Sequence, residues 1–227
     1  LRLPNAVAGV LVCLWTYRVG RRLFGPSAGL LAAACIAVSG MSGVYRSANG
    51  IGLFTWLLLG AFAALLDSLS AADPTKERRA LAAGAVWLGL ATWTFVEGGI
   101  FALSAAALYG WQRRRWKPLL GPALIYAGFA GIWVLLPALL LGRIGVGGNA
   151  AHILGRLQGL GAWNGAAFVG CLVTQASPGL ALLLVVGLGL YLRRWTPAST
   201  LVAVYVLPHW LVWMLLLEQP QGHEIYL

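Results

Sequence analysis

Eight long apolar runs, separated by short polar connections, make up most of this 227-residue sequence. A helix needs about 20 apolar residues to cross the hydrocarbon core of a bilayer, and fewer where flanking side chains reach the interface. We therefore expect an all-α fold, a polytopic transmembrane helical bundle of about eight spans. The composition agrees, since 60% of the residues are apolar and only 10% are charged, which excludes a disordered chain and a water-soluble enzyme. The expected spans have the approximate bounds 4–19, 27–45, 50–71, 80–96, 98–112, 119–142, 165–192 and 198–217.

The region 80–112 is long enough for one oversized helix or for two short helices. Glu97 and two following glycines lie at its centre, Arg78 and Arg79 lie before it, and the arginine triplet 113–115 follows it. A hairpin with its tip at Glu97 places both basic clusters on the same side of the membrane. Because cytoplasmic connections collect lysine and arginine, we predict the hairpin rather than the single helix.

Lysine and arginine are sorted between alternate connections along the whole chain. Twelve of the sixteen lie in one set of connections, which the positive-inside rule makes cytoplasmic. The net charge of +10 therefore reports membrane orientation, and we expect no nucleic-acid partner. The twelve are Arg18, Arg21, Arg22, Lys76, Arg78, Arg79, Arg113, Arg114, Arg115, Lys117, Arg193 and Arg194.

The other four basic residues, and much of the remaining polar chemistry, fall on the non-cytoplasmic side. Arg46 and Asn49 belong to a tight turn there, bracketed by glycines, and the planar fork of an arginine suits a phosphate group. The alternative is an arginine that only reaches the interface from a helix end. Residues 143–164 form the longest outward loop, in which we expect a short interfacial helix.

Two further places on the outward side carry ionisable groups. A carboxylate near the hydrocarbon core costs a few kcal/mol, roughly, unless it is paired or hydrated. Glu97 therefore either caps its turn, contacts a substrate or pairs with Arg46. His223 and Glu224, in the polar tail after the last apolar run, have the chemistry to bind phosphate or sugar hydroxyls, or to act as acid and base.

The acidic residues on the cytoplasmic side and the cysteines indicate no site. Asp67, Asp73 and Glu77 lie among basic neighbours, and we interpret them as parts of a solvated connector around 70–75. The three cysteines lie inside apolar runs and lack metal-ligand spacing, so the sequence predicts neither a metal site nor a disulfide.

Three motifs follow one another in the first part of the chain. They are Arg-Leu-Pro-Asn-Ala at 2–6, Gly-Arg-Arg-Leu-Phe-Gly at 20–25 and Gly-Leu-Leu-Ala-Ala at 29–33. In this order they resemble the GT-C superfamily of membrane glycosyltransferases, in the branch that holds the protein O-mannosyltransferases and the lipid A aminoarabinose transferase. The turn at 45–49 and the closing segment 222–227 are similar to further motifs of that branch, although an asparagine replaces the acidic residue of the turn.

This resemblance implies an enzyme that transfers a sugar from a polyprenyl-phosphate donor to an acceptor at the non-cytoplasmic face of the cell membrane. The expected partners are membrane lipid, the lipid-linked donor and an acceptor of unknown identity. Arg46 would stabilise the departing phosphate, as oriented charges do for developing anions. The residues that we expect to bind substrate are Arg46, Asn49, Glu97, His223 and Glu224.

In the family that this sequence resembles, the catalytic aspartate lies in an outward loop before the motif that corresponds to residues 2–6. We therefore expect the catalytic base upstream of Leu1, in a longer polytopic protein of which residues 1–227 form a single transmembrane domain. No cofactor is expected, because the lipid-linked sugar is a substrate, and the sequence leaves a divalent-metal requirement open.

Two other classes of function stay open at this point. A transporter or flippase would show broken helices, inverted repeats and ionisable residues near mid-membrane, whereas the ionisable groups here lie mostly near one interface. A non-catalytic membrane scaffold is the other alternative, since Asn49 departs from the family pattern.

Overall fold

Helices form every regular element that the structure describes. The computed structural model describes residues 2–38, 51–94 and 98–141, together with 198–205 and a few single or paired residues between 182 and 208. No strand occurs within these ranges, so the all-α prediction is confirmed for them. The elements are α1 (Arg2–Phe24), α2 (Pro26–Val38), α4 (Ile51–Ser70), α5 (Pro74–Thr94), α6 (Gly98–Arg113), the 3-10 turn η1 (Lys117–Leu119) and α7 (Leu120–Leu141).

The first six predicted spans each coincide with one of these helices. Among the described residues, the helix over Gly52–Ser70 alone is long and apolar enough to cross a membrane by length and composition. The count of eight spans thus stays a prediction. The spans expected at 165–192 and 198–217 lie largely outside the described residues, as does the interfacial helix expected within 143–164.

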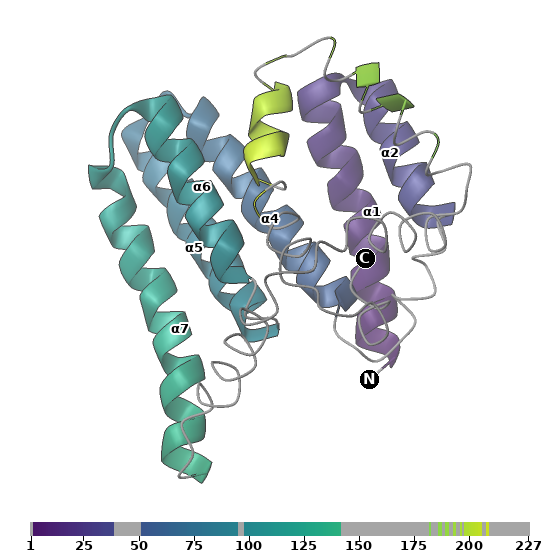
Figure 1. Cartoon of the computed structure of the whole chain (residues 1–227). Helices are drawn as coiled ribbons and strands as arrows, with labels where there is room; N and C mark the ends of the chain where they lie inside the picture. Colours follow the sequence, from purple (N-terminus) through teal and green to yellow (C-terminus); the bar gives the residue numbers. More distant parts are fainter. Residues whose placement is uncertain are drawn as a thin grey trace, which may run out of the picture.

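Neighbouring helices alternate in direction, and three of their connections share one end of the bundle (Figure 1). These connections join α1 to α2, α4 to α5 and α6 to α7. Because these connections and the helix turns beside them carry most of the described lysines and arginines, we call this the basic end. Helices α5 and α6 are two separate helices with both basic clusters at this end, so the predicted hairpin is confirmed.

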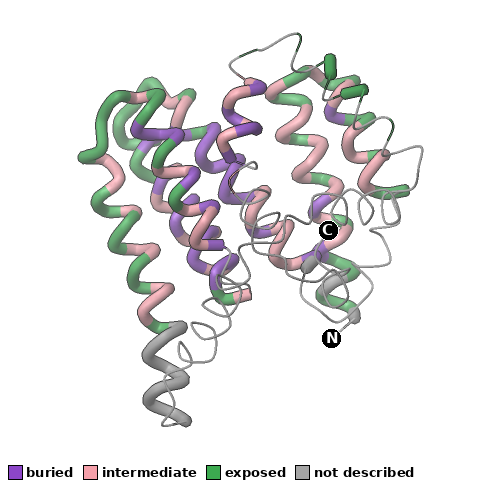
Figure 2. Tube along the Cα trace, in the orientation of Figure 1, coloured by how far each residue is buried: buried purple, intermediate pink, exposed green. Residues whose placement is uncertain are grey.

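The core lies where α4, α5 and α6 meet the helical stretch 198–205 (Figure 2). Phe62 on α4 stacks on Tyr205 with ring centroids 4.6 Å apart, and Phe101 on α6 approaches the same ring at 5.1 Å. The Tyr205 hydroxyl donates to the carbonyl of Leu58 at 3.1 Å. A segment distant in sequence is thereby fixed to the centre of the bundle.

The turn between α1 and α2 explains the glycines of the motif at 20–25. Gly25 has a φ of +95°, which an L side chain rarely adopts, and its amide donates to the carbonyl of Arg21 at 3.0 Å. The next residue, Pro26, begins α2, where a missing amide hydrogen costs nothing. A Cβ on Gly20 would lie 2.8 Å from the Cα of Gly29, so the two helices touch backbone to backbone.

Candidate functional site

The substrate-binding residues predicted from the sequence all lie outside the described residues. This applies to Arg46, Asn49, Glu97, His223 and Glu224.

Helix ends that flank two of these predicted places are described, however. Residues 39–50 follow the end of α2 and precede α4, and residues 95–97 connect α5 to α6. The start of α4, the end of α5 and the start of α6 lie at the end of the bundle opposite the basic end, and the shorter α2 ends part-way toward it (Figure 1).

A buried carboxylate organises the basic end. Glu77, in the first turn of α5, is only 3% exposed. The hydroxyl of Tyr109 on α6 donates to its Oε1 atom, and Nη2 of Arg115 lies 2.8 Å from Oε1 and 2.6 Å from Oε2. The Nε atom of Arg113 is 3.8 Å from Oε1. One carboxylate thus joins the start of α5 to the end of α6 and to the residues after it.

These contacts settle the charge state of Glu77. Burial alone raises the pKa of this carboxyl, but the hydrogen bonds from Tyr109 and Arg115 and the charges of Arg115 and Arg113 outweigh it, so the pKa lies below its ordinary value of 4.5. In return, the hydrogen bond to Glu77 and its negative charge raise the pKa of Arg115. The pair is fully ionised near neutral pH.

Two arginines donate to carbonyl groups at the end of α4 and just after it. The last carbonyls of a helix have no partner within the helix, and cations are favourable there. Arg113 donates through Nη2 to the carbonyls of Ser68 and Ala71 at 2.9 and 2.7 Å. Arg22, from α1, donates to the carbonyl of Leu66 at 3.1 Å and forms an ion pair with Asp67.

The interpretation of the cytoplasmic acids as solvated residues was wrong for one of the three, Glu77. Glu77 is buried, whereas Asp67 and Asp73 are both exposed. Asp67 forms an ion pair with Arg22 at the surface, and Asp73 caps α5, accepting from the amide of Thr75 at 2.9 Å. The helical period of the sequence contained a signal that Glu77 is buried. Glu77 lies four residues before Leu81, a core residue, and such residues share one helix face.

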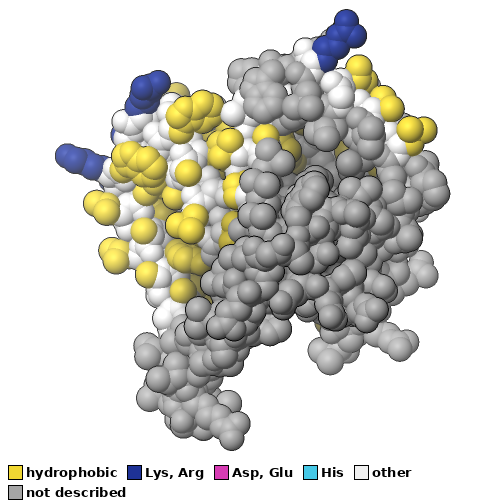
Figure 3. Space-filling model, in the orientation of Figure 1, with side chains coloured by type: hydrophobic (Ala, Val, Ile, Leu, Met, Phe, Trp, Pro, Cys, Tyr) yellow, Lys and Arg dark blue, Asp and Glu magenta, His cyan; other side chains and the backbone are white. Residues whose placement is uncertain are grey.

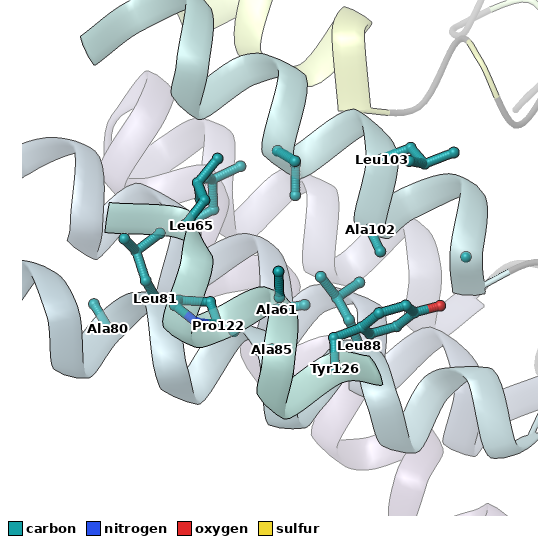
Figure 4. A pocket seen from close by; sticks show the side chains of 16 residues that line it. Ala61, Leu65, Ala80, Leu81, Ala85, Leu88, Ala102, Leu103, Pro122 and Tyr126 are labelled. Atoms are coloured by element: carbon teal, nitrogen blue, oxygen red, sulfur yellow. The ribbon is translucent and has the colours of Figure 1, made fainter. Parts of the chain in front are cut away.

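An apolar cavity of about 220 Å³ lies between α4, α5, α6 and α7 (Figure 4). Leucines and small residues line it. Among the lining side chains, that of Tyr126 carries a polar group, its hydroxyl. That hydroxyl shares a hydrogen bond of 3.1 Å with Oγ1 of Thr92, which itself donates to the carbonyl of Leu88. The lining residues are Ala61, Leu65, Ala80, Leu81, Gly84, Ala85, Leu88, Gly99, Ala102, Leu103, Ala105, Ala106, Leu119, Pro122, Ala123 and Tyr126.

A second, more polar hollow of about 460 Å³ lies at the basic end between α1, α4 and α6. Its cations, Arg22 and Arg113, are the two arginines that already bond the end of α4. Within the described ranges, no group of three or more His, Cys, Asp or Glu side chains is placed to hold a metal ion.

The comparison with protein families gives a match over α1 to α7. Residues 1–140 match the family described as dolichyl-phosphate-mannose-protein mannosyltransferase, which is more than half of the chain. The chain belongs to this family. The family indicates a membrane glycosyltransferase of the GT-C type, as the motifs at 2–6, 20–25 and 29–33 did. No curated protein and no solved structure matches the chain.

The residues that match the family include the main features of the described structure. The matched region contains both the basic end and the apolar cavity. The glycines of the 20–25 motif have a structural role in the α1–α2 turn, and Arg22 of the same motif holds the end of α4. These motif residues thus support the scaffold of a mannosyltransferase-type protein.

Proposed function

We propose that the protein transfers a sugar from a polyprenyl-phosphate donor to an acceptor at the non-cytoplasmic face of the membrane. The observation that carries the proposal is the family match over residues 1–140. In this proposal the chain crosses the membrane about eight times, and the donor and the acceptor meet at the end of the bundle opposite the basic end.

The charge distribution supports this choice of face. Connections rich in lysine and arginine stay on the cytoplasmic side of membrane proteins. The described basic connections lie together at one end of the bundle, held by Arg22, Arg113 and Arg115. If that end is cytoplasmic, the helix ends that flank 39–50 and 95–97 face the opposite compartment.

The chemistry requires a group that stabilises a phosphate. Transfer breaks the bond between the sugar C1 atom and the phosphate oxygen, and it forms a bond from C1 to an acceptor hydroxyl, which loses its proton. Negative charge therefore grows on the departing polyprenyl phosphate. We assign Arg46 to that phosphate because a guanidinium offers two parallel donors to it. Glu97 would orient Arg46 or the acceptor, and His223 and Glu224 would bind phosphate or sugar hydroxyls.

Substitution of Arg46 in the full-length protein tests this assignment. Loss of one group that stabilises developing charge lowers the rate by roughly 100-fold to 1,000-fold, so Arg46→Ala should reduce kcat by that order in a transfer assay with a polyprenyl-phosphate sugar. Arg46→Lys should retain an intermediate rate, since it keeps the charge but loses the fork.

Arg18 supplies the matched control for this experiment. It is an exposed arginine near the basic end, and its guanidinium lies 5.5 Å from the ring centroid of Trp15. Arg18→Ala should leave the transfer rate unchanged. Wild-type transfer by Arg46→Ala would remove Arg46 from the site.

A further inference from the structure

The apolar cavity exists because α6 and α7 do not close against each other. Helix α7 packs mainly against α5, and α6 packs against α5 and α4. The space between α6 and α7 is lined by small residues, such as Ala102 and Ala106 on α6 and Ala123 on α7. Small residues normally let membrane helices approach closely. Here they leave a gap whose rear wall is formed by α5 and α4 (Figure 4).

The cavity suits a hydrocarbon chain. The Tyr126 hydroxyl already bonds Thr92, so it needs no partner from a ligand. The volume of about 220 Å³ exceeds that of an apolar cavity of roughly 150 Å³, which holds benzene. Leu103 lines the cavity and is also 74% exposed, so the cavity reaches the surface of the bundle between α6 and α7.

Cations lie next to the end of the cavity that is nearest the basic end. This end is lined by Ala80 on α5 and Leu119 in η1. Lys117 lies in the same turn as Leu119, two residues before it. Arg78 lies two helical turns before Ala85, which lines the cavity, so Arg78 and Ala85 share one face of α5. Both side chains are exposed.

No described carboxylate pairs with either cation. The described ion pairs use Asp67 and Glu77, and their partners are Arg22, Arg113 and Arg115. In Figure 3, hydrophobic side chains cover the described part of the face at the left of the view, and lysine or arginine side chains lie along its upper edge. An apolar cavity with cations at one end that pair with no described carboxylate is complementary to an anionic lipid.

We propose that this cavity binds an anionic phospholipid of the surrounding bilayer. One acyl chain fills the space between α6 and α7, and the headgroup phosphate lies at Arg78 and Lys117. This lipid is distinct from the proposed sugar donor, because its phosphate lies at the basic end whereas the phosphate of the donor would lie at the opposite end. It completes the packing of the bundle where the two helices leave a gap.

The first test fills the cavity. Ala106→Leu adds a branched side chain inside it, and Ala107→Leu adds the same side chain at the next, exposed position outside it. Binding of phosphatidylglycerol to the full-length protein is measured by native mass spectrometry after lipid titration. Ala106→Leu should weaken binding about tenfold, as expected when about two buried methylene groups are displaced. Ala107→Leu should bind like the wild type.

The second test removes the charges. Arg78→Gln and Lys117→Gln should each weaken phosphatidylglycerol binding about fivefold, the effect of one cation near a lipid headgroup. Arg21→Gln is the matched control, because Arg21 is an exposed cation at the basic end on α1, away from the cavity. Phosphatidylcholine, which is neutral overall, should bind more weakly than phosphatidylglycerol to the wild type.

Two results would overturn the proposal. One is phosphatidylglycerol binding that is the same in Ala106→Leu and Ala107→Leu, since the acyl chain then lies elsewhere. The other is displacement of phosphatidylglycerol by an equimolar polyprenyl phosphate, together with equal phosphatidylglycerol binding by the Arg78→Gln, Lys117→Gln and Arg21→Gln variants. The cavity would then hold the chain of the donor. A thermal melt of each variant verifies that the protein is folded.

Discussion

Glu77 shows how one side chain holds several helices together. It is buried at the start of α5, and it accepts from Tyr109 and Arg115 while Arg113 lies close by. Removing one partner of such a buried charged group leaves the others without compensation. The stability of the basic end therefore depends on a residue that is not among the predicted substrate-binding residues.

Tyr109→Phe measures the hydrogen bond to Glu77 directly. Hydrogen bonds to charged groups contribute about 1.5–3 kcal/mol, so the free energy of unfolding should fall by that amount in detergent. Tyr17→Phe is the control, because Tyr17 is half-buried and its ring, which the substitution keeps, carries the contact with Arg21. Equal stability of the two variants would contradict the role given to Glu77.

The lowered pKa of Glu77 predicts a pH dependence with a definite sign. Its contribution is fully present above the ordinary pKa of 4.5 and is lost as the pH falls through the lower pKa of the folded state. Thermal midpoints measured from neutral pH downward should therefore drop below about pH 5. Glu77→Gln should be less stable at neutral pH and should show a shallower drop. An identical slope in both proteins would exclude Glu77 as the group that titrates.

At the scale of elements, the contact between α1 and α2 limits what the chain tolerates. A Cβ on Gly29 would lie 2.5 Å from the amide nitrogen of Arg21 and 2.7 Å from the carbonyl oxygen of Tyr17. Both are backbone atoms, so the helices would have to separate. The family motif at 29–33 thus begins with a residue whose side chain cannot grow.

Gly29→Ala and Gly128→Ala form a matched pair on two helices. Forcing a methyl group into a packed contact costs about 1–3 kcal/mol, so Gly29→Ala should lower the thermal midpoint. Gly128, on α7, has open space around it, and alanine favours the helix there by about 1 kcal/mol. Gly128→Ala should therefore keep or raise the midpoint. A stable Gly29→Ala variant would refute the backbone contact.

The hydropathy of the sequence predicted where the helices lie, but it did not always predict the residues at which they begin and end. Helix α5 begins at Pro74, whereas the apolar run predicted a span from residue 80, because the polar first turn with its Asp73 cap is also helical. The burial of Glu77 and the cavity beside Ala106 were not predicted. Both depend on how α5, α6 and α7 pack across the bundle, which residue order along one helix does not specify.

At the scale of the whole molecule, the proposed function requires the basic end and the substrate-binding residues to lie at opposite ends of the bundle. The basic end is described and is held by charged contacts. The predicted substrate residues, among them Arg46 and Glu97, lie outside the described residues and stay predictions. The family match supports the proposed reaction, and the sorting of charge supports its location.

Compartment-specific labelling of single cysteines tests this separation most directly. In a full-length protein whose native cysteines are replaced, Ser47→Cys and Gln112→Cys probe the connection after α2 and the basic end. A membrane-impermeant maleimide added to intact cells should label position 47 at once, and position 112 only after the membrane is permeabilised. Labelling of both positions from the same side would contradict the proposed arrangement.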